Sequence, residues 1–514
     1  MKKKTVSRPY SGFSKIIVTS ILLLVFSILS SGCAIHPKPL LPDELRSEAD
    51  KMRLNMATDQ EPVTGPIDIY EAMARAVKYN LNYRLKLMEE AIGLDQTKLA
   101  KFDLLPKMTA SAGYAKRSNV RASISESIAT GDISLEASTS EEKKLKTAGL
   151  ALSWNILDFG VSYYQAKQQT NKYLILSERR RKAVHNLLSD IRYAFWRAAA
   201  VEHLHAKIKS AKINAEKALE YAVTVEKERL KPMLEILTYQ KVLLEVTRKM
   251  ELLEQELALA KVELAHLMNL MPGTEFELKI PSTDKIRLLK YDDSLRALEN
   301  MALQQRPELK EIHYQKRISV DETRKSIASL FPGINFTVGT NYDSNKYIIN
   351  NSWSDIGTRL AWNLMDLVSA PQRIKLAKSQ EGMLEMQQKT LSMAVLSQLH
   401  IAYRQYKGFV RQLERDTKLE NVNEKIFQKV ESAYQADTQS RIEKIRAETN
   451  AIMARLQRFH SFAQLQNALG RAYASIGLDP LPENYNESNV STLSGTIRQK
   501  LEKWDNDFTV PSRH

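Results

Sequence analysis

Few residues of this 514-residue chain have types and spacings that could support catalysis or metal binding. There is one cysteine, Cys33, so an intramolecular disulfide and a four-cysteine zinc site are both excluded. His203 and His205 are close in sequence, but residues two apart on a helix do not face each other. No metalloprotease, nucleophile-elbow or phosphate-binding glycine motif is present. Acidic residues are plentiful, so a catalytic carboxylate pair stays open, although we expect no enzyme and no cofactor.

The region around Cys33 indicates a different chemistry, the covalent attachment of lipid. Cations among the first 15 positions precede an apolar run from Ile16 to Leu29, which is short for a membrane span and typical of a signal peptide. The small residues of "SSGC" lead to Cys33 as in bacterial lipoproteins, so we expect cleavage before Cys33 and acylation of its thiol and new amino group. Ser30 replaces the leucine usual in such signals, and an ordinary signal peptide is the alternative.

The charge of the chain does not indicate a polyanionic partner. The net charge is +15, and removal of residues 1–32, with five cations and no acid, leaves 15 − 5 = +10. Both signs are interleaved along tracts rich in Ala, Leu, Glu, Lys, Gln and Arg, a composition typical of long helices. No basic cluster with interleaved aromatic residues stands out, so we expect no nucleic-acid partner.

One sequence pattern, L-x-W-N-x-x-D, occurs twice, 208 positions apart. It contains Trp154 and Asp158 in the first copy and Trp362 and Asp366 in the second. Upstream, "LDQTKLAKFDLLP" from position 94 corresponds to "VDETRKSIASLFP" from position 320, and a Ser-rich loop at 117–146 makes the first copy longer. These matches predict a tandem duplication. We expect a signal peptide at 1–32, a linker at 33–64, repeats at 65–281 and 282–481, and a polar tail at 482–514.

Each copy changes from the hydrophobic period of a helix to that of a strand. In the first copy, helices are predicted over 67–80 and 82–102. Strict alternation then predicts two strands per copy, each of about nine residues, which fits a tilted transmembrane strand. They cover 107–114, 149–155, 334–339 and 356–363. A half-buried soluble sheet alternates in the same way and is favoured by alternation alone, whereas the export signal favours a membrane barrel.

The repeated Trp and Asp residues lie where a strand is expected to pass into a helix. Trp154 and Trp362 would end the second strand of each copy, at the membrane–water boundary that amphipathic aromatic rings favour. Asp158 and Asp366 would lie in the first helical turn, where exposed backbone N–H groups need an acceptor. A buried core tryptophan followed by a helix cap is the alternative, and it requires no membrane.

Each copy then continues as a very long helix and a return helix. No proline or glycine occurs from 161 to 229, a length on the order of 100 Å, and a similar tract, in which Gly382 and Gly408 are the only glycines, runs from 372 to 437. The first return helix has a 3.5-residue apolar repeat from Ile236 to Met271, which is typical of helices that pack side by side. The second, from Ile442 to Tyr473, has a looser repeat. We therefore expect two long antiparallel helical hairpins.

With these features, residues 65–481 resemble the TolC-like outer-membrane efflux proteins, and the Cys33 signal resembles that of their lipoprotein-anchored subgroup. The resemblance implies a mainly α fold with a small β part: two repeats, each with a transmembrane β-hairpin and long antiparallel coiled-coil helices. A homotrimer would form a 12-stranded β-barrel joined to a periplasmic α-helical barrel. It would be a passive conduit for efflux or type I secretion, lipid-anchored in the outer membrane and partnered by a periplasmic adaptor protein and an inner-membrane pump.

The same resemblance implies a periplasmic gate at the turn between the second long helix and its return helix. Members of the family have a Tyr, a Gly-containing turn and acidic residues facing the pore. Tyr434 corresponds to the Tyr, and Asp437 stands at the Gly position. Glu443 stands at one acidic position, whereas Arg446 reverses the charge of the other. Arg441, Glu443 and Arg446 would either pair across subunits to hold the tip closed or be ordinary solvated charges.

Two other classes of protein stay open on the sequence. A lipid-anchored periplasmic coiled-coil adaptor or structural protein would also use long hairpins. Adaptors usually carry one hairpin flanked by compact β domains, whereas this sequence predicts two hairpins. A lipid-anchored envelope enzyme is the third class. Channel-forming trimers would favour the conduit, and a soluble monomer would favour the other classes.

Overall fold

The computed structural model describes residues 38–134, 136–228, 232–281, 287–289, 295–481, 485 and 489–511. The expected signal peptide and Cys33 therefore lie outside the described residues. The chain divides into two compact units, Met1–Asp59 and Gln60–His514. In its described part the first unit contains helix α2 (Pro42–Asn55), in which no residue is buried. All elements named below belong to the second unit.

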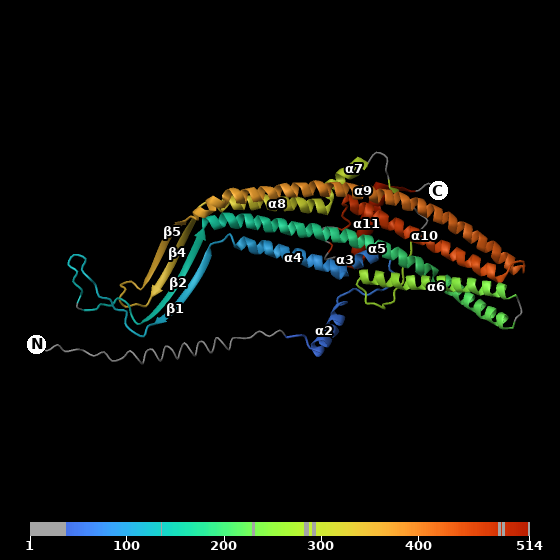
Figure 1. The fold of residues 1–514 in the computed structure, drawn as a ribbon, viewed down its shortest axis with the longest axis horizontal. Coiled ribbons are helices and arrows are strands. Elements are labelled where there is room, and N and C mark those ends of the chain that lie inside the picture. Colours follow the sequence, from blue (N-terminus) through green and yellow to red (C-terminus); the bar gives the residue numbers. More distant parts are fainter. Residues whose placement is uncertain are drawn as a thin grey trace. The chain divides into compact units, whose positions relative to one another are not determined.

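A four-stranded antiparallel sheet adjoins the starts of the long helices (Figure 1). In spatial order its strands are β1 (Lys107–Lys116), β2 (Lys144–Asn155), β4 (Gly333–Asp343) and β5 (Ser352–Ala361). The strand pairs of the two sequence copies join in one sheet because β2 pairs with β4. β1 and β5 form the edges, and the outer side of each has no strand partner among the described residues.

The strand register gives the sheet one apolar face and one face of small or polar residues, because directly opposite residues share a face. One apolar row crosses all four strands: Met108, Leu152, Val338 and Ile356. The adjacent row on the other face is Thr109, Ala151, Gly339 and Asp355. The apolar row is exposed, by 83% at Ile356 and 69% at Met108. A half-buried soluble sheet would instead cover this face with other parts of the chain.

Two helices of 72 residues each lead away from the sheet, α5 (Ile156–Lys227) and α9 (Leu364–Gln435). At 1.5 Å per residue each is roughly 110 Å long. The sequence predicts a start of the second helix near position 372, but α9 begins at Leu364 and includes Pro371. The reason is that Asn363 caps the helix, while the proline removes a single backbone hydrogen bond. In the described part of the chain, no helix has the length and apolarity to cross a membrane.

Each long helix packs along a shorter return helix, as the sequence predicts. α5 pairs with α6 (Met233–Leu267), and α9 pairs with α10 (Arg441–Ile476). The apolar repeat of α6 is buried, for example at Leu243, Met250 and Leu264. Alanines of α5 belong to the same buried cluster as the α6 residues Leu243 and Met250: Ala211, Ala215, Ala218 and Ala222. The alternating spacing of three and four residues on both helices keeps this seam continuous along the hairpin.

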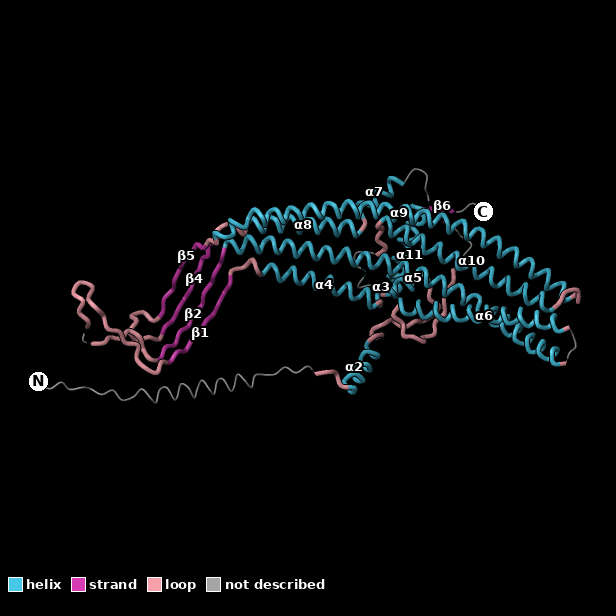
Figure 2. The backbone as a smooth tube through the Cα atoms, viewed as in Figure 1, coloured by secondary structure: helices cyan, strands magenta, loops and turns pink. Residues whose placement is uncertain are grey.

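Two further helices run beside the long ones and differ in their surroundings (Figure 2). α8 (Pro307–Ala328) packs against both α5 and α9, whereas α4 (Leu81–Phe102) packs along α5. On its other side α4 has a stripe of exposed apolar residues: Leu81, Leu85, Met88, Ile92 and Leu99. Thus α8 is enclosed by two long helices, while α4 keeps one apolar side open.

The segment expected as a polar tail contains a helix that belongs to the core. α11 (Val490–Phe508) packs against α3 (Ile69–Tyr79). Its buried face consists of Val490, Leu493, Ile497 and Leu501. The following strand, β6 (Thr509–Pro511), pairs antiparallel with β3 (Arg287–Leu289), which precedes α7 (Leu295–Gln305). The C-terminal segment therefore contacts the beginnings of both sequence copies.

Candidate functional site

Asparagine caps both junctions between strand and long helix. The side chain of Asn155 accepts a hydrogen bond from the N–H of Leu157 at 3.0 Å. The side chain of Asn363 accepts one from the N–H of Met365 at 3.2 Å. Both asparagines precede the first helical residue, and from this position a short side-chain oxygen reaches the free N–H groups of the first turn. The asparagine of the repeated W-N-x-x-D pattern is thus the cap.

The aspartates of the repeated pattern, which the sequence predicts as acceptors for the helix start, lie inside the first turn. Asp158 is exposed, and Asp366 pairs with Arg373 at 3.0 Å. Their negative charges still interact favourably with the positive, N-terminal end of the helix dipole. The aspartates thus lie in the first turn, where the sequence places them, and the hydrogen bond to the free N–H comes from the asparagine before the helix.

The two tryptophans lie at the end of the sheet that joins the long helices. Trp154 is 42% exposed and makes an edge-to-face contact with Phe159, with ring centroids 5.8 Å apart. Trp362 is 48% exposed and donates its indole N–H to the carbonyl oxygen of Leu330 at 3.0 Å. Neither ring is buried in the chain, in contrast to the core tryptophan of the alternative interpretation.

We expect Asn363→Ala to lower the free energy of unfolding by about 1 kcal/mol, because the N–H of Met365 loses its acceptor. Asn363→Ser should retain most of the stability, since serine is also a good cap. Urea denaturation of the full chain measures both changes. Equal stability of the alanine and serine variants would contradict this role of the asparagine.

The tip of the second hairpin contains an aspartate in a backbone conformation that usually favours glycine. Asp437 has a φ of 54°, in the left-handed region. The turn closes when the N–H of Thr438 donates to the carbonyl of Ala433 at 2.9 Å, and Ser440 then caps α10. Asp tolerates the left-handed conformation better than most residues, which explains why it can occupy the Gly position of the family pattern.

The structure brings two of the candidate gate residues into direct contact. Arg446 pairs with Glu443 at 2.7 Å, one turn apart on α10, and both side chains are well exposed. Tyr434 instead lies under the ammonium group of Lys444, which is 4.8 Å from the ring centroid. Arg441 is exposed at the start of α10. The contact between Arg446 and Glu443 is thus available within one chain.

A groove of about 790 Å³ at the tip of the first hairpin is a feature that the sequence did not predict. It lies between the end of α5, the start of α6 and the start of α10, where Arg441 is one of its lining residues. Most of its other walls are apolar: Tyr221, Val225, Pro232, Leu234 and Ile236. Tyr221 and Leu234 are 63% and 79% exposed. The sequence signal that could have indicated this groove is Leu234, an apolar residue that lies outside the 3.5-residue apolar repeat of α6.

Solved structures provide the decisive comparison. The CmeC outer membrane channel of Campylobacter jejuni matches with a TM-score of 0.63 and 12% identity, over 93% of this chain and 99% of that one. The MtrE channel of Neisseria gonorrhoeae matches with a TM-score of 0.58 and 15% identity, over 79% and 89%. The outer membrane protein VceC of Vibrio cholerae gives 0.60 and 11%, over 80% and 96%. This chain has the outer-membrane channel fold.

The outer-membrane channel fold confirms the mainly α architecture with a small β part that the sequence resemblance implied. No protein-family model matches the sequence, and no curated protein matches it. The similarity therefore lies in the arrangement of strands and long helices rather than in sequence identity. The trimer, the 12-stranded barrel, the repeat boundaries and the gate stay predictions.

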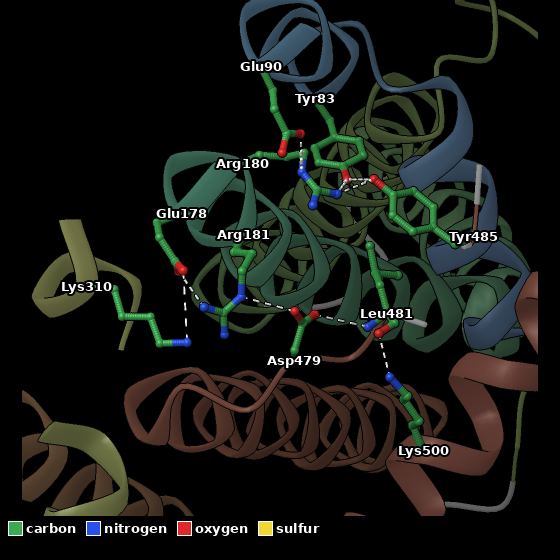
Figure 3. A network of polar contacts seen from close by, with 10 residues as sticks. All are labelled: Tyr83, Glu90, Glu178, Arg180, Arg181, Lys310, Asp479, Leu481, Tyr485 and Lys500. Atoms are coloured by element: carbon green, nitrogen blue, oxygen red, sulfur yellow. Dashed lines mark hydrogen bonds and ion pairs between the residues drawn. The ribbon is translucent and has the colours of Figure 1, made fainter. Parts of the chain in front are cut away.

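Within the channel fold, a polar network connects the C-terminal segment to α4 and α5 (Figure 3). The hydroxyl groups of Tyr83 in α4 and Tyr485 share a hydrogen bond. Arg180 of α5 donates to Tyr485 at 2.8 Å and pairs with Glu90 at 2.7 Å. Burial, together with the neighbouring Tyr485, raises the pKa of Tyr83, so this phenol stays protonated. No sequence signal links Tyr83 with Tyr485, which are 402 positions apart.

The other half of this network connects both sequence copies (Figure 3). Arg181 of α5 lies between Asp479, at 3.1 Å, and Glu178. Lys310 of α8 approaches Glu178 to 3.9 Å. Asp479 in turn accepts from the backbone N–H of Leu481 at 3.2 Å. These contacts connect α5, α8 and the residues that follow α10, where the C-terminal segment begins.

His185 of α5 lies close to this network and is buried, with 7% of its surface exposed. Burial lowers its pKa to about 4, and Arg181 acts in the same direction, whereas the Asp479 carboxylate opposes the shift. The pKa of His185 in the folded protein thus lies below that of histidine in the unfolded chain. The neutral ring therefore contributes stability above about pH 6.5, and this stability is lost as the pH falls toward 4.

We therefore expect the wild-type chain to lose up to about 3 kcal/mol more stability between pH 7 and pH 4 than His185→Gln, which has no imidazole to protonate. Urea denaturation at each pH measures this difference. His205→Gln serves as the control, because His205 is exposed on the same helix. Identical pH dependence of wild type and His185→Gln would show that His185 does not protonate in this range.

Proposed function

We propose that the chain is one subunit of a trimeric outer-membrane channel, a passive conduit across the outer membrane and periplasm in a tripartite efflux or type I secretion system. The exposed apolar face of the sheet carries this proposal. The strands contain 10 to 12 residues, a length suited to tilted strands that cross a bilayer. An apolar face without a protein cover is stabilised when lipid covers it.

The open sheet edges support assembly of several copies. Each unpaired backbone N–H or C=O group in hydrocarbon costs several kcal/mol, so β1 and β5 need partners there. The three strand pairs of this sheet are antiparallel, so β5 of one copy can pair with β1 of the next without breaking the alternation. Three copies, the number that the family resemblance implies, would close a barrel of twelve strands.

The helices carry a matching pair of unpartnered apolar stripes. α8 packs against α9 of its own chain, whereas the exposed stripe of α4 has no second long helix beside it in the described chain. α9 has an exposed stripe on the side opposite α8: Leu376, Met383, Met386, Met393 and Ile401. We infer that α4 packs against α9 of a neighbouring copy and continues the α8–α9 arrangement around a helical barrel.

The helix tips are the proposed docking and gating region. The apolar groove at the first tip offers a surface for the helices of a periplasmic adaptor protein, next to Arg441. We propose that Tyr434, Asp437, Glu443 and Arg446 form the periplasmic gate, with the pair between Glu443 and Arg446 exchanging partners when the tips separate. Since the sequence has no phosphate-binding glycine motif, an inner-membrane pump would supply the energy.

Two further features would fix the channel in its membrane. Trp154 and Trp362 are half-exposed rings next to the strand ends, which suits the membrane–water boundary. Cys33, outside the described residues, would carry the lipid anchor. Palmitate labelling of the wild type, and its loss in Cys33→Ser, would be the expected result for the anchor.

The proposal is tested by adding the purified full-length protein to planar lipid bilayers. We expect discrete conductance steps, together with trimers on a gel that become monomers on heating. A monomer that leaves bilayers intact would favour a periplasmic coiled-coil adaptor or structural protein. Sensitivity of a deletion strain to antibiotics and metal ions would then identify the class of cargo.

A further inference from the structure

Three lysines lie together on one face of the sheet, at the end remote from the long helices (Figure 1). Lys116, the last residue of β1, is directly opposite Lys144, the first residue of β2. Lys146 follows two positions along β2, so its side chain points to the same face. All three side chains are exposed. They form a lysine cluster that extends the apolar face, because Leu150 and Leu152 continue the same alternation along β2.

The lysine cluster is unfavourable without a counter-ion. Directly opposite residues of an antiparallel pair have Cβ atoms about 5 Å apart, and like charges there destabilise the sheet. In the described part of the chain, none of the three lysines has an ion pair with an acid. The two acids before β2 are engaged elsewhere. Glu141 pairs with Arg121 at 2.5 Å, and Glu142 lies 3.9 Å from the ammonium group of a lysine outside the cluster.

The lysine cluster lies about one hydrophobic thickness from the tryptophan at the other end of the sheet. Trp154, at the proposed membrane boundary on the helix side, is eight residues from Lys146 and ten from Lys144. At about 3.4 Å per residue these separations are roughly 27 and 34 Å along the strand. With a strand tilt of about 40° they become roughly 21 and 26 Å across the membrane, close to the apolar band of about 25 Å in bacterial barrels. This height corresponds to the second membrane boundary.

Two exposed tyrosines support this height. Tyr114 is directly opposite Lys146, and Tyr342 is directly opposite Ala148, so both rings lie on the apolar face. They are 63% and 44% exposed. Transmembrane barrels carry bands of aromatic residues at both membrane boundaries. Aromatic rings next to cations thus mark the end of the apolar surface that the proposed channel exposes to lipid.

The charge of the lysine cluster determines which headgroup suits it. Ammonium groups form charge-assisted hydrogen bonds with phosphate oxygens, which are stronger than hydrogen bonds between neutral groups. A headgroup with a single phosphodiester has one negative charge, whereas the three lysines have three positive charges. A headgroup with two phosphate groups neutralises the cluster more completely, and its acyl chains can lie along the exposed side chains of Leu150 and Leu152.

We propose that the lysine cluster binds a lipid headgroup with two or more phosphate groups, in the membrane leaflet remote from the long helices. The proposal rests on the proposed membrane position of the sheet. The bound headgroup would remove the repulsion between Lys116 and Lys144 and fix this end of the sheet at the membrane boundary.

The test uses the full-length protein in detergent and native mass spectrometry. The probes are lipid A, a glycolipid with two phosphate groups, and monophosphoryl lipid A, which has one. We expect tighter binding of lipid A, and an affinity for lipid A lower by about tenfold or more in Lys144→Gln/Lys146→Gln. The matched control is Lys209→Gln/Lys217→Gln, two exposed lysines of α5, which should bind like the wild type.

Thermal unfolding of the same variants separates a loss of binding from a loss of folding. Without lipid A, Lys144→Gln/Lys146→Gln should unfold at the wild-type temperature or above it, because a pair of like charges is removed. Saturating lipid A should raise the unfolding temperature of the wild type and of the control variant, and should leave that of Lys144→Gln/Lys146→Gln nearly unchanged.

Three results would overturn the proposal: equal affinity for the two lipids, equal losses in the cluster and control variants, or binding of inorganic phosphate as tight as that of lipid A. The last result would indicate a site for free anions. Conductance in bilayers of phosphatidylcholine alone tests the proposed function separately. A conducting channel without preference for lipid A would refute only the lipid site, whereas a protein that does not conduct would refute the proposed function itself.

Discussion

Ile92→Glu in α4 is expected to weaken assembly by about a hundredfold or more. Ile92 is 58% exposed in the single chain and lies in the apolar stripe that we propose packs against α9 of a neighbouring copy. In the assembly the new carboxylate would be buried without a partner, at a cost of several kcal/mol in every contact between copies. Since 1.4 kcal/mol changes an equilibrium tenfold, trimers should be replaced by monomers at micromolar concentration. Mass photometry in detergent measures this change.

The control for Ile92→Glu is Ala91→Glu. Ala91 is exposed on the same helix but points about 100° away from Ile92, off the apolar stripe. It should assemble like the wild type, and both variants should retain the wild-type helical circular dichroism, because neither side chain belongs to the core of the single chain. Trimers of normal stability in Ile92→Glu would rule out α4 as a contact between copies.

Val338→Arg is expected to destabilise the inserted channel by about 2–4 kcal/mol per chain. Val338 lies at the middle of β4, on the apolar face of the sheet. There an arginine would meet the centre of the lipid layer, where a cation has neither water nor a counter-charge. Urea titration of the protein folded into phospholipid vesicles measures the loss.

Thr337→Arg is the matched control for Val338→Arg, because Thr337 is at the same height and its side chain belongs to the other face. That face already holds Arg359 and Asp355, so it accepts charge. We expect Thr337→Arg to insert with nearly wild-type stability and to change conductance instead. A reversed order, with Thr337→Arg the less stable variant, would mean that the faces are assigned the wrong way round.

The elements of the fold could be predicted from sequence because their periods are local. Alternation of Met108, Ala110, Ala112 and Tyr114 with small or polar residues predicts β1, and the structure confirms the strand. The 3.5-residue repeat predicts the hairpin of α5 and α6 in the same way. What alternation could not decide was whether the apolar face meets protein or solvent. That depends on whether other elements cover the face, which is a property of the whole chain.

Contacts between residues far apart in the sequence could not be predicted from local sequence periods. Tyr83 and Tyr485 are separated by 402 positions, and each has an ordinary local sequence. The burial of α11 depends on a complementary face of α3, not on its own pattern alone. The capping residue of α5 could not be predicted for a related reason. Asn155 and Asp158 are both good hydrogen-bond acceptors, and only the helix start at Ile156 determines which of them caps the helix.

In the proposed channel, β1 of one copy completes the sheet of the next at β5, inside the membrane. Hydrogen exchange of the strand amides in vesicles measures this pairing directly. In an antiparallel edge strand, alternate N–H groups point outward and exchange rapidly unless another strand accepts their hydrogen bonds. We predict that β1 and β5 are protected as uniformly as β2 and β4. Rapid exchange at every second amide of β1 and β5 would contradict the closed barrel.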